Sequence, residues 1–215
     1  MRISPSRDEF RALAAAHGVV PVWAEVLADC HTPVGAFTAL VGDEPGFLLE
    51  SVEHGERWAR FSFVGCRPRA EIALIDGKVQ MSGAVPDSVP RDKGFLGALE
   101  AMLAAYRAPV MPELPPLQGG MIGHIGYDIV REIEHLPDAP RDNRHIPDAV
   151  MSMIGSLAAF DHWRQRAYLI ESVPTLGLTA DQVDAAYDAA MVAVQRMVND
   201  LAKASVNDVI EPPTI

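Results

Sequence analysis

The sequence predicts an α+β fold with a mixed, largely antiparallel β-sheet and flanking helices. Three features predict it: short apolar or alternating stretches fill most of the chain, turn signals join several neighbouring stretches, and helical patterns occur near both ends. Apolar residues make up 49% of the 215-residue chain, which is enough for a substantial core. This length fits one large domain or two small ones.

The first expected element is a helix that begins after Ser6. Ser6 and Glu9 have the spacing of a capping box, and apolar residues follow at helical intervals until His17-Gly18 ends the pattern. Residues 19–27 are rich in valine and predict an extended strand. Residues 32–40 are compatible with either a strand or a helix.

Two antiparallel pairings are expected next. Residues 47–52 form a short apolar run and residues 60–65 alternate between polar and apolar, so the two are expected to pair across the segment between them. A second hairpin joins residues 71–75 to residues 78–81 through Asp76-Gly77, a pair that favours a type I′ turn.

The middle of the chain predicts a helix, a connector and a glycine-rich strand. The helix covers about residues 92–106, and the prolines in 109–116 exclude regular structure there because proline lacks a backbone donor. Residues 119–127 are expected to form a strand that leads into a helix capped by Asp128.

The last third predicts paired strands and a long helix. Residues 148–160 and 165–173 are expected to pair around a turn at 161–164. Asp161 followed by His162 is typical of an Asx turn rather than of a catalytic triad. A final helix over about residues 179–201 carries its apolar residues on one face.

Charge and composition exclude several classes of partner and site. The 18 basic residues against 29 acidic residues give a net charge of −11, which argues against a nucleic-acid partner. No apolar run approaches the roughly 20 residues that a membrane span needs, so no membrane association is expected. The two cysteines and the polar N-terminus predict a cytoplasmic protein. The seven histidines include no His-x-x-x-His pair, and no metal site is expected.

The stretch from Leu48 to Ser51 is the strongest candidate for a site. In a strand, Leu48 and Glu50 lie on one side and Leu49 and Ser51 on the other, so neither side is plainly solvent-facing. A carboxylate at such a position needs a partner. Chemistry alone leaves two interpretations open: a structural ion pair at a sheet edge, or a ligand site.

Two arginines are candidate partners for Glu50. If Val52 pairs with Arg57 across the turn, Arg57 lies diagonal to Glu50 on the same face, and Arg60 is also near. Either arginine could hold the carboxylate in place or act as a cationic donor to a ligand.

Three segments, taken in order, resemble the N-terminal region of the anthranilate synthase component I family. The segments are residues 47–66 (Phe-Leu-Leu-Glu-Ser-Val-Glu, then Glu-Arg-Trp-Ala-Arg-Phe-Ser-Phe-Val-Gly-Cys), residues 119–137 (Gly-Gly-Met-Ile-Gly-His-Ile-Gly-Tyr-Asp-Ile-Val-Arg to Leu-Pro) and residues 160–162 (Phe-Asp-His). Together they span nearly the whole chain. The resemblance implies the N-terminal part of a larger β-sandwich fold.

The same resemblance implies a feedback-inhibition site for L-tryptophan. In that family the Leu-Leu-Glu-Ser strand lines the inhibitor site, which places Glu50 and Ser51 beside the ligand and Leu48 and Leu49 near it. Arg57 and Arg60 are then supporting residues, as donors to the ligand or as partners of Glu50.

The resemblance also implies a division of labour in tryptophan biosynthesis. Residues 1–205 are expected to form the N-terminal domain and residues 206–215 the start of an interdomain linker, with the chorismate-binding domain absent. That domain carries the catalytic residues and the Mg²⁺ ligands of this carbon-oxygen lyase, so no catalytic residue or cofactor is expected here. The family converts chorismate and ammonia into anthranilate and pyruvate with a glutamine amidotransferase subunit.

Two alternatives stay open at this point. The first is a stand-alone module that binds or senses an aromatic amino acid. The second is a fragment of aminodeoxychorismate synthase component I, which shares the scaffold, although residues 56–65 are closer to the anthranilate branch.

Overall fold

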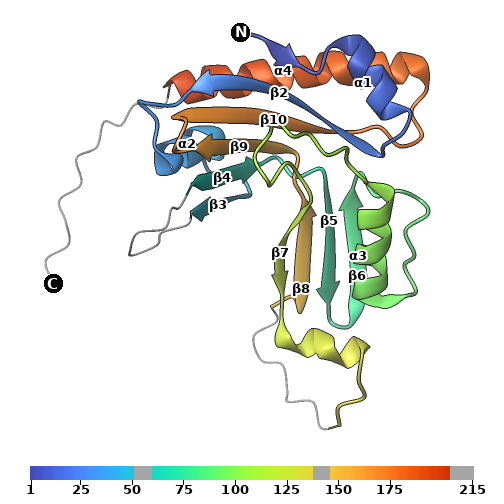
Figure 1. Cartoon of the computed structure of the whole chain (residues 1–215). Helices are drawn as coiled ribbons and strands as arrows, with labels where there is room; N and C mark the ends of the chain where they lie inside the picture. The colour runs from blue at the N-terminus through green and yellow to red at the C-terminus, as the bar shows by residue number, and fades with distance from the viewer. Residues whose placement is uncertain (51–59, 138–145, 204–215) are drawn as a thin grey trace, which may run out of the picture.

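The fold consists of two antiparallel sheets, each with helices packed against it (Figure 1). The structure is a computed structural model, and it describes residues 1–50, 60–137 and 146–203. Every strand pairing in these ranges is antiparallel, so the expected α+β class is confirmed. The expected linker, residues 206–215, lies outside the described ranges.

The larger sheet has six strands and is covered on one face by three helices (Figure 1). Its strands, in spatial order, are β1 (Ile3–Ser4), β2 (Val19–Leu27), β10 (Arg166–Pro174), β9 (Ser156–Asp161), β4 (Phe61–Cys66) and β3 (Gly46–Glu50). The covering helices are α1 (Arg7–Ala14), α2 (Pro33–Leu40) and α4 (Ala180–Lys203). Strand β3 is an edge strand, so one side of its backbone has no partner strand in the described sheet.

The smaller sheet has four strands and extends away from the larger one at a steep angle (Figure 1). Its strands, in spatial order, are β6 (Lys78–Gly83), β5 (Ala70–Ile75), β8 (Ala149–Met153) and β7 (Met121–Ile125). Helix α3 (Gly94–Ala105) packs against it through the buried residues Phe95, Ala98 and Met102. Asp76 and Gly77 both have positive φ, which confirms the predicted hairpin turn.

Local sequence signals account for the N-terminal ends of α1 and α2. Helix α1 has the predicted capping box, because Ser6 accepts from the Glu9 backbone and the Glu9 carboxylate accepts from the Ser6 backbone. The ambiguous segment 32–40 is a helix: Thr32 caps it through the Gly35 N–H, and Pro33 occupies its first turn.

The described helices include none that is both long enough and apolar enough to cross a bilayer.

Two predictions about the glycine-rich region and its partner were wrong. The segment 148–160 is two strands, β8 and β9, which belong to different sheets; only β9 pairs with residues 166–171 of β10, as predicted for the whole segment. The break falls at Gly155, where an added Cβ would lie 1.9 Å from the Arg67 carbonyl oxygen. The segment after β7 is a 3₁₀ helix, η1 (Tyr127–Glu132), and Gly126 rather than Asp128 is its N-cap residue.

A buried carboxylate lies where the chain crosses between the sheets. Glu171 is 2% exposed and lies in one row with Ser156 and Cys66 across β10, β9 and β4. The Ser156 hydroxyl donates to it at 2.5 Å, and Arg69, just before β5, forms an ion pair with it. Burial raises the pKa of the Glu171 carboxyl, because the loss of hydration outweighs these favourable contacts.

The raised pKa of Glu171 predicts a pH-dependent stability. The folded state keeps this proton to a higher pH than the unfolded chain, so the free energy of unfolding falls as the pH rises above about 4.3 through the folded-state pKa. Glu171→Gln keeps the shape but cannot ionise: its amide oxygen can still accept from Arg69, and its NH2 group would then donate to the Ser156 hydroxyl. Urea unfolding of both proteins across this range is expected to show that the wild type loses stability relative to the variant as the pH rises. Parallel curves would contradict the prediction.

Candidate functional site

Strand β3 directs its two leucines to opposite faces of the larger sheet. Leu48 packs against the helix-covered core. Phe47 and Leu49 lie on the other face, where both line a cavity. The alternation expected for this stretch is therefore confirmed for its apolar residues. It separates the two leucines by role: Leu48 anchors the strand, and Leu49 is available to a ligand.

The cavity beside β3, called here the β3 cavity, lies between the edge strands of the two sheets. Its volume is about 350 Å³, which is within the range of about 300–1,000 Å³ typical of small-molecule sites. The described residues that line it are Pro45, Gly46, Phe47, Leu49, Gly65, Cys66, Pro68, Ile122, Gly123, Ser152, Met153 and Ile154. They are mostly apolar, so the cavity suits an apolar or aromatic group.

A glycine on the neighbouring strand sets the position of Phe47. Gly65 lies directly opposite Phe47, and an added Cβ at Gly65 would be 2.0 Å from the Phe47 ring. The ring therefore lies across the bare backbone of β4 instead of pointing away from the sheet. Cys66 is buried beside it, and burial raises the pKa of its thiol, so the cysteine acts as an apolar wall residue.

Glu50 ends β3 at an exposed position opposite Ser62. The predicted pairing of Val52 with Arg57 would place Glu50 opposite residue 59, so the register is displaced by three residues from that prediction. The described lining of the cavity does not include Glu50. Ser51 and Arg57 lie outside the described residues, and their expected roles stay predictions.

Arg60 pairs with Asp161 rather than with Glu50. Its Nε and Nη2 donate to the two Asp161 carboxylate oxygens at 3.1 and 2.7 Å. The guanidinium also lies over the rings of Phe61 and Trp163, 4.6 and 4.9 Å from their centres. The ion pairs of the described ranges include none between Arg60 and Glu50. Arg60 therefore fixes the start of β4.

Asp161 is the charged centre of the turn after β9. It also accepts the backbone N–H groups of Trp163 and Arg164, which confirms the predicted Asx turn. Burial, the largest influence, would raise the pKa of the Asp161 carboxyl, but the hydrogen bonds from Arg60 and the backbone together hold it below its usual range. His162 contacts the Ser62 hydroxyl at 2.8 Å and closes the turn against β4.

The described residues do not contain a group of three His, Cys, Asp or Glu side chains that could hold a metal ion. The donor set for the Mg²⁺ implied by the family resemblance is therefore not found in the described ranges.

Most of the cavity wall was not predicted from the sequence. Phe47, Cys66 and Pro68 lie close to the predicted strand, but Ile122 and Met153 come from distant segments. The one local signal was a glycine, residue 65, in an otherwise apolar strand, which marks a close approach of another side chain.

The fold and cavity define a class of protein: a two-sheet α+β domain with a small-molecule cavity between its sheets. Comparison with models of known protein families gave no match. Comparison with curated proteins gave anthranilate synthase component 1 from several bacteria. The chain is 38% identical over 199 residues to that of Mycolicibacterium smegmatis (92% of this chain, 38% of the relative). It is 34% identical over 214 residues to that of Arthrobacter globiformis (99% and 40%).

A solved structure supports the same relationship at the level of the fold. Anthranilate synthase component I from Streptococcus pneumoniae aligns with a TM-score of 0.53 and 23% identity, covering 85% of this chain and 37% of that one. The chain is therefore related to anthranilate synthase component 1. It spans about two fifths of the length of the curated relatives it matches.

The Arg60–Asp161 pair predicts a measurable loss of stability on substitution. Asp161→Asn removes two charge-assisted hydrogen bonds from a side chain that is 2% exposed, while Arg60 keeps partial access to water. We expect the free energy of unfolding at pH 7 to fall by about 1.5–3 kcal/mol. Because the pKa of Asp161 is lowered, this stabilisation is present above about pH 3.9 and is lost on further acidification, so the two proteins should converge there.

The matched control for that experiment is Asp128→Asn. Asp128 also pairs with an arginine, Arg131, at 3.0 Å, but its side chain is 53% exposed. Urea unfolding should therefore give a change within about 0.5 kcal/mol. Equal losses for the two variants would show that the buried Asp161 pair stabilises the fold no more than the exposed Asp128 pair does.

Proposed function

We propose that this chain is the N-terminal, tryptophan-sensing and scaffold region of an anthranilate synthase component I. In this proposal the complete enzyme converts chorismate and ammonia into anthranilate and pyruvate for tryptophan biosynthesis in the cytoplasm. The chorismate-binding region, with its catalytic residues and Mg²⁺, is additional to the residues described here. A glutamine amidotransferase subunit supplies the ammonia. The identity to curated relatives over most of the chain supports the assignment.

The β3 cavity is the observation that carries the sensing role. Tryptophan presents a large flat indole, and the cavity offers the Phe47 ring, Leu49 and Ile122 on its walls within a volume of about 350 Å³. Burying an indole against such walls gains on the order of 25 cal/mol per Å² of apolar surface removed from water. The cavity therefore accounts for the side chain of the proposed ligand.

The polar half of tryptophan needs partners that the cavity walls do not provide. Among the described lining residues none carries a charge, and Ser152 already donates to Glu71 at 3.1 Å. Glu50 is exposed at the end of β3 but shares the Leu48 side of the strand, so it can reach the ammonium group of the ligand only around the strand end; the family resemblance adds Ser51 as a hydroxyl partner. Arg60 is held by Asp161, so the cation for the ligand carboxylate is expected from the chorismate-binding region.

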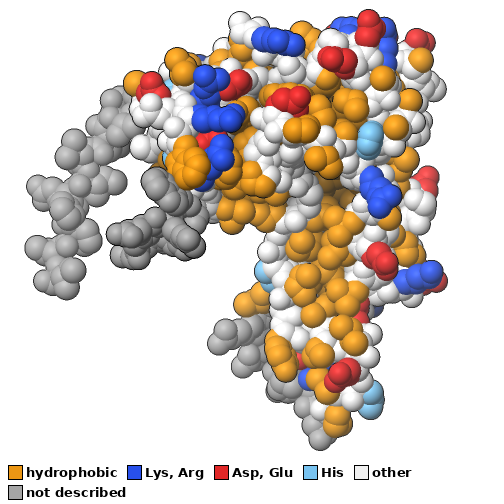
Figure 2. Space-filling view, viewed as in Figure 1, with side chains coloured by type: hydrophobic (Ala, Val, Ile, Leu, Met, Phe, Trp, Pro, Cys, Tyr) orange, Lys and Arg blue, Asp and Glu red, His pale blue; other side chains and the backbone are white. Residues whose placement is uncertain are grey.

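The exposed apolar surface supports the scaffold role. Figure 2 shows apolar side chains gathered in the angle between the sheets and down the smaller sheet. Three apolar side chains at this end of the smaller sheet are exposed: Ile125 at the end of β7 by 44%, Tyr127 on η1 by 88%, and Ile133 just after η1 by 70%. A surface of this kind is typical of a contact with another protein region. We assign that contact to the chorismate-binding region.

Feedback inhibition follows from this arrangement by linkage. Tryptophan can lower activity only if it binds one arrangement of the two regions more tightly than the other. In this proposal the apolar half of the tryptophan site lies on this chain and the charged half on the other region. The affinity for tryptophan then depends on how the two regions are placed, which meets that condition.

Isothermal titration with L-tryptophan tests the proposal. The chain alone is expected to bind weakly, and mixing it with the chorismate-binding region of the same enzyme is expected to raise the affinity and to give turnover of chorismate. Leu49→Ala should weaken tryptophan binding by the mixture about tenfold, because part of a leucine contact is lost.

The control variant is Leu27→Ala, at a leucine that is 71% exposed at the end of β2 and outside the cavity; it should leave the affinity unchanged. Micromolar binding by the chain alone would instead favour a stand-alone sensor. If the mixture makes aminodeoxychorismate, the chain belongs to that branch.

A further inference from the structure

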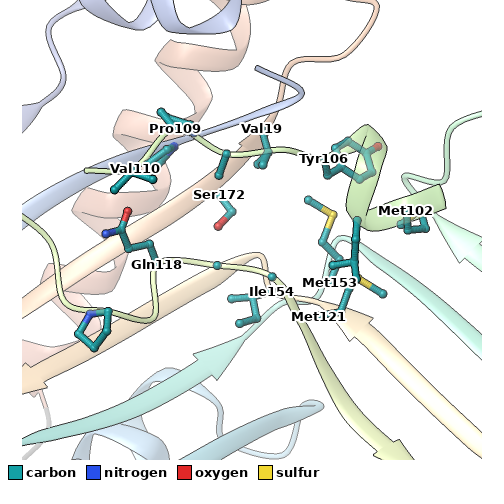
Figure 3. Close-up of a pocket in the computed structure, with 16 residues that line it drawn as sticks. Val19, Met102, Tyr106, Pro109, Val110, Gln118, Met121, Met153, Ile154 and Ser172 are labelled. Atoms are coloured by element: carbon teal, nitrogen blue, oxygen red, sulfur yellow. The ribbon is translucent and has the colours of Figure 1, made fainter. Parts of the chain in front are cut away.

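A second cavity, called here the connector cavity, lies under the proline-rich segment that joins α3 to β7 (Figure 3). Its volume is about 310 Å³. It is surrounded by segment 108–120, the end of α3, the start of β2 and the end of β8. It is separate from the β3 cavity, because the β7–β8 pair lies between them: Met121 lines the connector cavity and the next residue, Ile122, lines the β3 cavity.

The wall formed by the connector is held in place by side-chain hydrogen bonds. The Gln118 amide accepts from the Met111 backbone N–H at 3.3 Å and donates to the Met111 carbonyl at 2.8 Å. These two bonds close the segment into a loop, in place of the backbone pairing that its prolines prevent. Pro116 within this loop and Pro109 just before it line the cavity, so the wall is preformed.

Ser172 supplies a hydroxyl to the connector cavity that makes no hydrogen bond to another described residue. The residue is 4% exposed, and its backbone N–H donates to the Gly155 carbonyl at 2.8 Å. Figure 3 shows its hydroxyl pointing into the cavity. An added Cβ at Gly119 would lie 3.1 Å from this oxygen, so the glycine keeps the space beside it open. This hydroxyl faces the cavity and makes no hydrogen bond to a described residue, so it is available to a ligand group.

The rest of the lining restricts the chemistry of that ligand. The described residues around the cavity include no charged side chain, so a carboxylate or ammonium group would be buried unpaired at high cost. Three methionines, Met102, Met121 and Met153, provide soft walls that adapt to flat rings. The volume of about 310 Å³ lies at the lower end of the range of about 300–1,000 Å³ typical of small-molecule sites, so a single-ring molecule fits within it.

From these features we propose that the connector cavity is a binding site for a small, neutral, single-ring molecule whose one hydroxyl or carbonyl group hydrogen-bonds to Ser172. The site differs in chemistry from the β3 cavity, where the proposed ligand is a charged amino acid. It does not depend on the proposed function, since it rests only on the connector, Ser172 and the uncharged lining.

The experiment uses the full chain with ¹³C-labelled methionine methyl groups and three probes of the same size. Benzyl alcohol is neutral with one hydroxyl, toluene lacks the hydroxyl, and benzoate carries a charge. Benzyl alcohol is expected to shift the methyl signals of Met102 and Met121, which line only this cavity. Toluene should bind roughly threefold to tenfold more weakly, which is the contribution of one neutral hydrogen bond, and benzoate should give no shift.

Two serine variants test the role of the hydroxyl. Ser172→Ala should weaken benzyl alcohol roughly threefold to tenfold and leave toluene unchanged. Ser152→Ala is the matched control, because Ser152 is also on a strand but lines the β3 cavity and is bonded to Glu71; it should change neither affinity. If Ser172→Ala does not fold, the comparison of benzyl alcohol with toluene on the wild type decides the question.

Three outcomes would overturn the proposal: no shift of Met102 and Met121 at saturating benzyl alcohol, equal binding of benzoate, or equal binding of toluene and benzyl alcohol. A repeat with Leu49→Ala separates this site from the β3 cavity. That variant should leave the benzyl alcohol affinity unchanged even where it weakens tryptophan, so either proposal can fail without the other.

Discussion

The buried carboxylate of Glu171 is the interaction on which the relation between the two sheets depends. Glu171 lies on β10, a central strand of the larger sheet, and its ion-pair partner Arg69 directly precedes β5 of the smaller sheet. The chain crosses between the sheets twice at this point, and the Arg69 backbone N–H donates to the Met153 carbonyl at 3.0 Å where the crossings meet. An ion pair at this point therefore ties both crossings to one strand.

The two cavities are consequences of that junction. Two sheets that diverge at a steep angle cannot fill the space between them with side chains from their own strands alone. On one side of the β7–β8 pair the space is bounded by the edge strand β3, and on the other side by the connector. Met153 and Ile154, the last residues before the crossing, line both spaces. The end of β8 and the residue that follows it are thus the common wall of both cavities.

Signals that act over a few residues predicted much of the fold. The capping box at Ser6 and the turn at Asp76-Gly77 depend on neighbouring residues, and both occur as expected. The break at Gly155 was not predictable in this way, because the close approach that requires a glycine there involves the Arg67 carbonyl, which is far away in sequence. The same holds for the Arg60–Asp161 pair, which joins residues 101 positions apart. A local argument instead assigned Arg60 to its nearer neighbour Glu50.

The candidate site was predictable only as a strand, not as a cavity. Alternation correctly separated Leu48 from Leu49, but no pattern within residues 47–50 indicates that Ile122 of β7 closes the space opposite them. The shared wall limits how the two cavities can be related. Occupying one cavity can change affinity in the other only if Met153 and Ile154 have two arrangements that the ligands distinguish. A flexible methionine at that position provides the adaptable side of such a wall, while Ile154, held by its backbone N–H on the Gly120 carbonyl at 2.9 Å, provides the fixed side.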